Sequence, residues 1–222
     1  MANFYETEWE SPELDTLPSL AQHLVYRLNG CDDRIVRITL QEVYRDFCRR
    51  SCCLRVRRHF DFEPDGNYFV SPMFGGELER ITGVYDGCWL LREGRDYTVN
   101  GNFVHLRRSL HNTPPPPEDH PDVPPPPPEK HPRFALSISW IEMPSLSSEK
   151  APKWLLKKHG DTICAGVMAR LLAMSNRQWS DPQMAAIESN RYEAALNAEC
   201  QKLYAVGDSG NMGNVFDTSD LI

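Results

Sequence analysis

The chain has 222 residues, of which 41% are hydrophobic and 25% charged, a balance that is ordinary for one large or two small globular domains. No run of about 18 apolar residues is present, which excludes a membrane-spanning helix, and the acidic N-terminus lacks the features of a secretory signal. Seven cysteines in such a chain favour reduced thiols over a disulfide framework.

The net charge of −7 is concentrated at the two ends. Residues 1–16 contain five acidic side chains and residues 205–222 contain three, with no Lys or Arg in either segment. The remaining body, residues 17–204, carries 23 acidic and 24 basic side chains. A body without a large cationic field is poorly suited to binding nucleic acid. We expect the acidic ends to be flexible or partner-docking tails.

Residues 17–52 predict a pair of helices. The first helix is expected to end at Asn29-Gly30, a favoured C-terminal signal. Asp32 or Asp33 is suited to cap the second helix, because a carboxylate accepts the free N–H groups of a first turn. The short connection makes the two helices an antiparallel hairpin. Their apolar stripes consist of Leu20, Leu24, Leu28, Ile35, Val36, Leu40, Val43, Tyr44 and Phe47.

Four of the seven cysteines lie at the ends of the second helix, at Cys31, Cys48, Cys52 and Cys53. A zinc site needs two ligand pairs with short spacing, and no second cluster completes the Cys-x3-Cys-Cys group. Free cysteine otherwise behaves as a small apolar residue. We predict structural thiols here, with metal binding and redox chemistry as alternatives, and we predict no metal or cofactor for the chain.

From about residue 53 the pattern changes to the alternation of β-strands. Asp86-Gly87 and Asn100-Gly101 each separate two strand-like runs, and such pairs are strong hairpin signals. The residues between about 84 and 106 therefore predict two successive hairpins in an antiparallel meander. We expect residues 53–144 to form a β domain of five or six strands.

Within this domain, residues 111–132 contain 11 prolines. A proline run favours the extended polyproline II conformation and cannot pair in a sheet. The segment predicts a semi-rigid loop between two strands. An alternative is a docking element, including Pro124, Pro125 and Pro126, for an SH3- or WW-type groove or for another chain of one assembly.

Residues 145–204 predict a second helical hairpin. Pro152 is a favoured first-turn residue, and Gly166 lies within a stripe of small residues along which another backbone can approach closely. Asp181 is suited to cap the last helix, with Pro182 at its first position. The stripe of the first of these helices includes Ala165, Ala169 and Ala173, and that of the second includes Ala185, Ala186, Ala194, Ala195 and Ala198, with Ile187, Tyr192 and Leu203 as bulk.

These elements predict an α+β fold in which two helical hairpins form a four-helix bundle with an inserted antiparallel β domain containing a polyproline loop. The expected segments are an acidic N-terminal tail (1–16), the first hairpin (17–52), the β domain (53–144), the second hairpin (145–204) and a C-terminal docking tail (205–222).

No catalytic motif is recognisable in the sequence. The serine-hydrolase, zinc-protease, P-loop and dinucleotide-binding patterns are all absent. Cys164 and Cys200 fall within predicted helices, away from the helix starts and turns that activate a thiolate. We therefore predict that the chain is not an enzyme and has no catalytic residues.

The order of elements resembles a known family. The segments that carry the resemblance are IVRITLQEVYRDFCRRS, NYFVSP, ITGVYDGCWL, RDYTVNGN, DTICAGVMARLLAM, NRQWSDPQMA and YEAALNAE. Together they are similar to the head–tail adaptor (connector) proteins of tailed bacteriophages, over about residues 17–204. The polyproline insertion departs from the shorter loop that is usual in the family.

The resemblance implies a structural virion protein at the head–tail junction, present in the host cytoplasm during assembly. It implies a ring of twelve copies that binds the portal protein above and a tail or nozzle protein below, with DNA only as passing cargo and no membrane contact. Alternatives are a tail-completion or terminator ring, and a polyproline-dependent interaction module. The expected interface residues are Trp179 in the connection between the last two helices, Pro124, Pro125 and Pro126, and the apolar anchors Val215, Phe216, Leu221 and Ile222 of the C-terminal tail.

Overall fold

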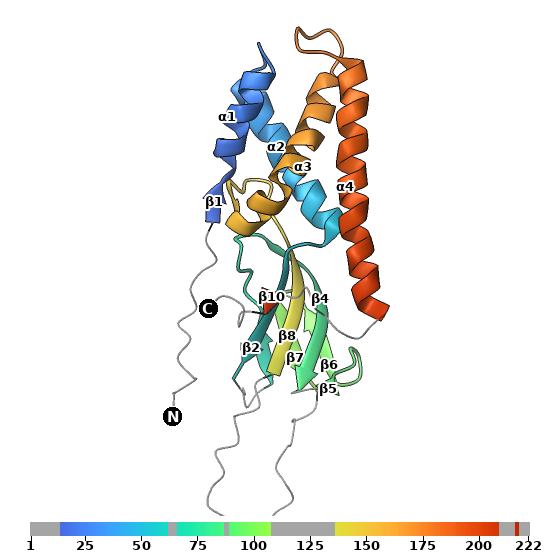
Figure 1. Cartoon of the computed structure of the whole chain (residues 1–222). Coiled ribbons are helices and arrows are strands. Elements are labelled where there is room, and N and C mark those ends of the chain that lie inside the picture. Colours follow the sequence, from blue (N-terminus) through green and yellow to red (C-terminus); the bar gives the residue numbers. More distant parts are fainter. Residues whose placement is uncertain (1–13, 62–65, 87–88, 108–135, 209–215, 218–222) are drawn as a thin grey trace, which may run out of the picture. The chain divides into compact units, whose positions relative to one another are not determined.

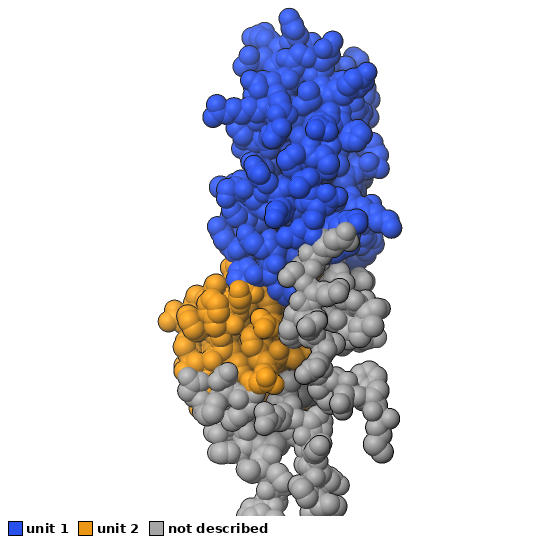
Figure 2. Space-filling model, turned by 90° about the vertical axis from the view of Figure 1, so that its left-hand side faces the viewer, with its two compact units in different colours: residues 1–54, 72–77, 142–214 blue, residues 55–71, 78–141, 215–222 orange. Residues whose placement is uncertain are grey.

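A computed structural model of the chain describes residues 14–61, 66–86, 89–107, 136–208 and 216–217, and for 203–208, 216 and 217 the backbone alone. The fold is mixed α+β, with four helices in the described residues and sheets that pair mainly antiparallel, which confirms the predicted class (Figure 1). The chain divides into two compact units (Figure 2). Unit 1 comprises residues 1–54, 72–77 and 142–214, and unit 2 comprises residues 55–71, 78–141 and 215–222.

Unit 1 contains the helices. Asp32 caps α2 by accepting a hydrogen bond from the backbone N–H of Arg34 at 2.8 Å, and Asp181 caps α4 by accepting from Gln183 and Met184 at 3.1 and 3.0 Å. Both caps are as the sequence predicts. The helices are α1 (Leu17–Arg27), α2 (Asp33–Ser51), α3 (Lys153–Leu172) and α4 (Pro182–Asp208).

A short two-stranded sheet joins the start of α1 to the start of α3. Strand β1 (Leu14–Thr16) pairs antiparallel with β9 (Lys150–Pro152), and the N–H of Leu17 donates to the carbonyl of Glu149 at 2.9 Å. Residues 14–16 therefore belong to a strand, whereas the sequence placed them in the acidic tail. The pairing links residues more than a hundred positions apart, and a strand of three residues gives no periodic signal.

Helix α2 packs against the three other helices of unit 1, α1, α3 and α4. Its predicted stripe is buried at Val36, Leu40, Val43, Tyr44 and Phe47. The face next to α4 is closed by charged groups. The Arg50 guanidinium donates to both carboxylate oxygens of Glu193, at 2.8 and 2.6 Å, and the paired charge lowers the pKa of that carboxyl.

Three helices of unit 1 approach one another closely at Gly166. A Cβ atom placed there would lie 2.7 Å from Cγ1 of Val43 and 2.8 Å from Cδ2 of Tyr192, so α2, α3 and α4 meet over this residue. The Tyr192 hydroxyl then donates to Asp46 of α2 at 3.1 Å. The small-residue stripe that the sequence predicts on α3 thus has one position, Gly166, where no side chain fits.

Residues 72–77 join unit 1 through a buried carboxylate. Glu142 is fully buried, and its two oxygens accept from the backbone N–H groups of Met73 at 2.6 Å and Phe74 at 2.9 Å. The Arg45 guanidinium also donates to the carbonyl of Pro144 and to Glu77, at 2.9 and 3.2 Å. These bonds join groups far apart in sequence and hold residues 72–77 in unit 1. Sequence patterns assigned this loop only to the β domain.

Unit 2 contains two sheets. In the first the strand order is β10-β2-β8-β4-β5, and in the second it is β3-β7-β6. The predicted hairpins at Asp86-Gly87 and Asn100-Gly101 are present as β4–β5 and β6–β7. A single meander is not, because β5 and β6 lie in different sheets. The strands are β2 (Arg55–Phe60), β3 (Asn67–Phe69), β4 (Glu77–Asp86), β5 (Trp89–Leu90), β6 (Tyr97–Asn100), β7 (Phe103–Leu106), β8 (Leu136–Met143) and β10 (Phe216–Asp217).

Substitution of two glycines of α3 tests the close approach. Gly166→Ala should destabilise the protein by about 1–3 kcal/mol, because the added methyl group overpacks the contact with Val43 and Tyr192. The matched control is Gly160→Ala, whose Cβ meets only Leu20 at 3.7 Å. That variant should gain about 0.5–1 kcal/mol from helix propensity. Urea unfolding measures both, and equal effects of the two substitutions would contradict the assigned packing.

The burial of His159 in α3 indicates that the stability of the protein depends on pH. Burial beside Phe47, 5.0 Å between ring centroids, lowers its pKa, and although Glu199 opposes the shift, Lys158 adds to it. The unfolded chain therefore binds the proton more readily, so stability should fall as the pH falls below about 6.5.

Urea unfolding between pH 7.5 and 5.5 measures this loss. His159→Gln should lose less of its free energy of unfolding over the range than the unmodified protein, whereas the same change at exposed His23 should leave the dependence intact. Identical pH dependence in the two variants would exclude His159 as the cause.

Candidate functional site

The structure places the predicted interface residues in separate parts of the chain. Trp179 lies in the α3–α4 connection of unit 1, and Phe216 lies in β10 of unit 2. The other six, Pro124, Pro125, Pro126, Val215, Leu221 and Ile222, lie outside the described residues. The described residues therefore contain two candidate contact regions, one in each unit.

In unit 2, the C-terminal strand covers an edge of the larger sheet. Phe216 pairs with Val56 and Asp217 with Arg57 in parallel register, while the other side of β2 is bonded to β8. A sheet edge presents unpaired N–H and C=O groups that bind an added strand with little regard to sequence. The C-terminal segment can therefore form the backbone hydrogen bonds by which a strand from one chain adds to the sheet of another. In this structure it forms them with β2 of its own chain.

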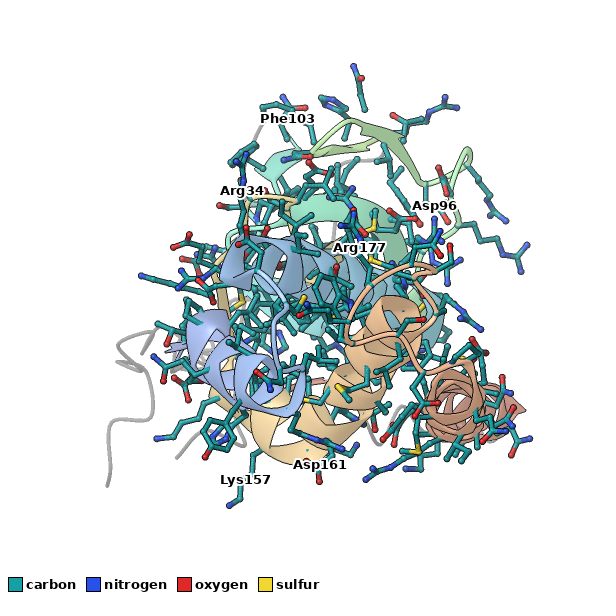
Figure 3. The ribbon with its side chains drawn as sticks, turned by 90° about the horizontal axis from the view of Figure 1, so that it is seen from above. Arg34, Asp96, Phe103, Lys157, Asp161 and Arg177 are labelled. Carbon is teal, nitrogen blue, oxygen red and sulfur yellow. The ribbon has the colours of Figure 1, made fainter. Side chains whose placement is uncertain are left out.

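In unit 1, two connections lie side by side at one end of the helices. A Cβ on Gly30, in the α1–α2 turn, would lie 3.1 Å from Oε1 of Gln178 in the α3–α4 connection. Arg177 has its guanidinium 5.8 Å from the Trp179 ring centroid, and Figure 3 shows it in this connection. We call these two connections, with the adjoining ends of α1 and α4, the tip of unit 1.

The tip has an exposed apolar surface. Tyr26 on the last turn of α1 is 92% exposed, and Ile187 near the start of α4 is 58% exposed. The indole Nε1 of the half-buried Trp179 has no acceptor among the described residues, although a buried indole N–H usually finds one. Exposed aromatic side chains such as that of Tyr26 are common in protein-contact surfaces.

Sequence reasoning missed Tyr26 and misplaced Ile187. The stripe predicted for α4 is confirmed at Ala185 and Tyr192, which are buried, and wrong at Ala186, Ala194 and Ala198, which are exposed; the buried side also includes Glu188. Glu188 lies 3.7 Å from the Arg27 guanidinium and 3.9 Å from that of Arg191. An acidic residue at a buried position shifted the apparent apolar face, and pairing with two arginines is what permits its burial.

The cysteines at the end of α2 cap the helix. The Ser51 hydroxyl donates to the carbonyl of Phe47 at 2.7 Å, the Cys52 thiol to that of Arg49 at 3.5 Å, and the Cys200 thiol to that of Arg50 at 3.2 Å. The last four carbonyls of a helix have no partner within it, so the Cys52 and Cys200 thiols satisfy those of Arg49 and Arg50. The six described cysteines are free thiols, and no metal-binding group of His, Cys, Asp or Glu occurs in the described ranges.

One Ser–His pair resembles the start of a nucleophilic dyad. The hydroxyl of Ser137 lies 2.7 Å from Nδ1 of His59, and the two residues are register partners in β8 and β2. Ser137 is buried, however, which keeps its oxygen from a substrate. The pair is accounted for as a cross-strand hydrogen bond.

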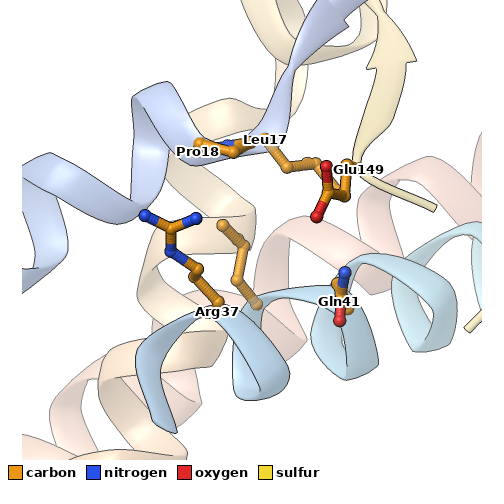
Figure 4. A pocket seen from close by; sticks show the side chains of 6 residues that line it. Leu17, Pro18, Arg37, Gln41 and Glu149 are labelled. Atoms are coloured by element: carbon orange, nitrogen blue, oxygen red, sulfur yellow. The ribbon is translucent and has the colours of Figure 1, made fainter. Parts of the chain in front are cut away.

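The concave regions near the helices are small or open. A cavity of about 20 Å³ lies among Leu17, Arg37, Gln41 and Glu149 (Figure 4), which is space for about one water molecule. Lys157 and Asp161 point outward from α3 (Figure 3) and do not enclose a site. None of the described helices is sufficiently long and apolar to cross a lipid bilayer.

Comparison with known proteins gave no family assignment. The chain matches no protein-family model and none of the curated proteins at a significant level.

Shortening the C-terminus tests the β10–β2 pairing. Deleting residues 216–222 should speed hydrogen exchange at amides along the exposed edge of β2 by about tenfold per lost hydrogen bond, with no change in α2. Deleting only residues 218–222, beyond the strand, is the control and should leave the exchange of β2 unchanged. Hydrogen-exchange mass spectrometry measures both, and equal exchange in the two proteins would contradict the pairing.

Proposed function

We propose that the chain is a structural virion protein, a head-to-tail adaptor that forms a ring between the portal and the tail, with the twelve copies that the resemblance implies. In this proposal the four helices form one bundle, the strands form an inserted antiparallel β domain, and the proline-rich segment projects from it as a loop. The particle's DNA passes through the ring without being bound.

The observation that carries the proposal is the pairing of Phe216 and Asp217 with the edge of β2. Seven residues, 209–215, separate this strand from the end of α4. A strand that is held by backbone bonds at the end of the chain is suited to dock on another subunit, because the same bonds can be made to any open edge. This supports the role expected for the C-terminal tail.

The tip of unit 1 supports a second contact. A subunit in a ring needs head-to-tail side contacts as well as contacts to the proteins above and below. Tyr26, Trp179 and Ile187 supply the aromatic and aliphatic surface that such contacts use. The nearly neutral charge of residues 17–204 is also suited to a channel wall that does not retain DNA.

Native mass spectrometry of the purified full chain, alone and mixed with the portal protein of the same genome, tests the function. The expected result is a twelve-subunit species, either alone or with the portal. A monomer that does not bind the portal would contradict the adaptor and favour the polyproline-dependent module. A six-subunit ring would favour the terminator.

Variants then assign the contacts. Trp179→Ala and deletion of residues 216–222 should each reduce the fraction of assembled rings, whereas Trp89→Ala, which alters an exposed tryptophan in β5 of unit 2, should leave assembly unchanged. Full assembly of both altered chains would remove these residues from the interface.

A further inference from the structure

Two thiols in unit 1 are in direct contact. The sulfur of Cys48, in the last turn of α2, lies 3.8 Å from the sulfur of Cys53, just after the helix. Cys48 is fully buried, whereas Cys53 is partly exposed. Cys53 is thus the less buried residue of the pair.

The contact follows from how the helix ends. Cys52 has left-handed backbone angles, φ 48° and ψ 37°, which stop α2 and turn the chain back over its last turn. In this type of helix ending, the residue after the left-handed position packs against the residue three positions before the last helical residue. Here these two residues are Cys53 and Cys48. The chain is held on the far side as well, since the carbonyl of Leu54 accepts from the N–H of Glu142 at 2.9 Å.

The two neighbouring thiols are directed elsewhere. Cys52 donates to the carbonyl of Arg49 and Cys200 to that of Arg50, as described above. Four thiols therefore surround the end of α2, and the backbone geometry selects one pair among them for sulfur–sulfur contact.

We propose that Cys48 and Cys53 are a modification site at which a low-molecular-weight disulfide, such as oxidised glutathione, forms an intramolecular disulfide bond. The sulfurs must approach from 3.8 Å to about 2.05 Å for the bond to form. The inference concerns the chemistry of unit 1 and does not depend on the proposed function.

The reaction balances as a thiol–disulfide exchange. The Cys53 thiolate attacks one sulfur of the oxidant, forming a mixed disulfide and releasing the first thiolate. Cys48 then gives up its proton and attacks the Cys53 sulfur, releasing the second. Two protein thiols are oxidised and one small disulfide is reduced to two thiols.

The environment of each sulfur agrees with this order. The hydrogen bond with Cys48 lowers the pKa of the Cys53 thiol against the opposing effect of burial. Burial raises the pKa of the Cys48 thiol, and the neighbouring Cys53 adds to the rise. The thiol of the less buried residue is thus the one that ionises first, as an attacking group requires.

Peptide mapping of the folded full-length protein tests the proposal. After exposure to oxidised glutathione, alkylation and tryptic digestion, peptide 46–49 should be linked to peptide 51–55, with a loss of two hydrogen atoms from the intact mass. Reduction should restore both peptides. Absence of the link in the folded protein, with both thiols alkylated, would overturn the proposal.

Adjacent cysteines provide matched variants. Cys53→Ser should abolish the link, and Cys52→Ser, one position away in the same tryptic peptide, should retain it at the level of the unmodified protein. Circular dichroism of each variant establishes that α2 is intact. A link that survives Cys53→Ser and disappears in Cys52→Ser would assign the reactive pair to Cys48 and Cys52 and would equally overturn the proposal.

Discussion

The arrangement of unit 1 depends on the contact at Gly166. Helices can approach closely only where side chains leave room, and here Val43 and Tyr192 occupy the space that a side chain on α3 would fill. The approach brings the Tyr192 hydroxyl to Asp46 and the Arg50 guanidinium to Glu193. Packing and polar contacts between α2 and α4 thus share one geometric requirement, the absence of a side chain at one position of a third helix.

The polar groups of unit 1 follow from this packing. Glu188 and Glu142 are both buried acids in an apolar setting, and each is accommodated differently. Two arginines flank Glu188, while two backbone N–H groups bind Glu142. A carboxylate with two backbone donors holds a loop in place at low cost, because its charge is satisfied by groups that would otherwise need partners themselves. Segment 72–77 is attached to the helices in this way.

Local signals in the sequence predicted local structure well. The caps at Asp32 and Asp181 depend on a few adjacent residues, and the apolar stripe of α2 depends on one period, so both could be read without knowledge of the fold. The hairpin turns at Asp86-Gly87 and Asn100-Gly101 are equally local.

Features that join distant segments could not be predicted. The β1–β9 pair, the separation of β5 and β6 into two sheets, and the binding of Met73 and Phe74 by Glu142 all depend on contacts that leave no periodic trace. The face of α4 was assigned correctly only in part, because a buried glutamate breaks the apolar pattern from which the face is inferred. Trp179 stays a predicted contact residue, whereas Tyr26 and Ile187 were assigned no contact role, since exposure is a property of the folded unit.

The two candidate contact regions would bind a partner through different interactions, side-chain packing in one and backbone hydrogen bonds in the other. This difference bears on the proposed assembly. The tip of unit 1 offers exposed apolar side chains, which select a partner of complementary shape. The edge of β2 offers backbone groups, which accept any extended strand of suitable length. In the proposed ring, a subunit would benefit from having both, because shape can specify the repeated contact between copies while backbone pairing tolerates a change of partner. The C-terminal strand already occupies the edge of β2 in the single chain, so docking elsewhere requires exchanging one set of hydrogen bonds for an equivalent set. Such an exchange has a small free-energy difference, and the partner's other contacts then decide which edge the strand occupies.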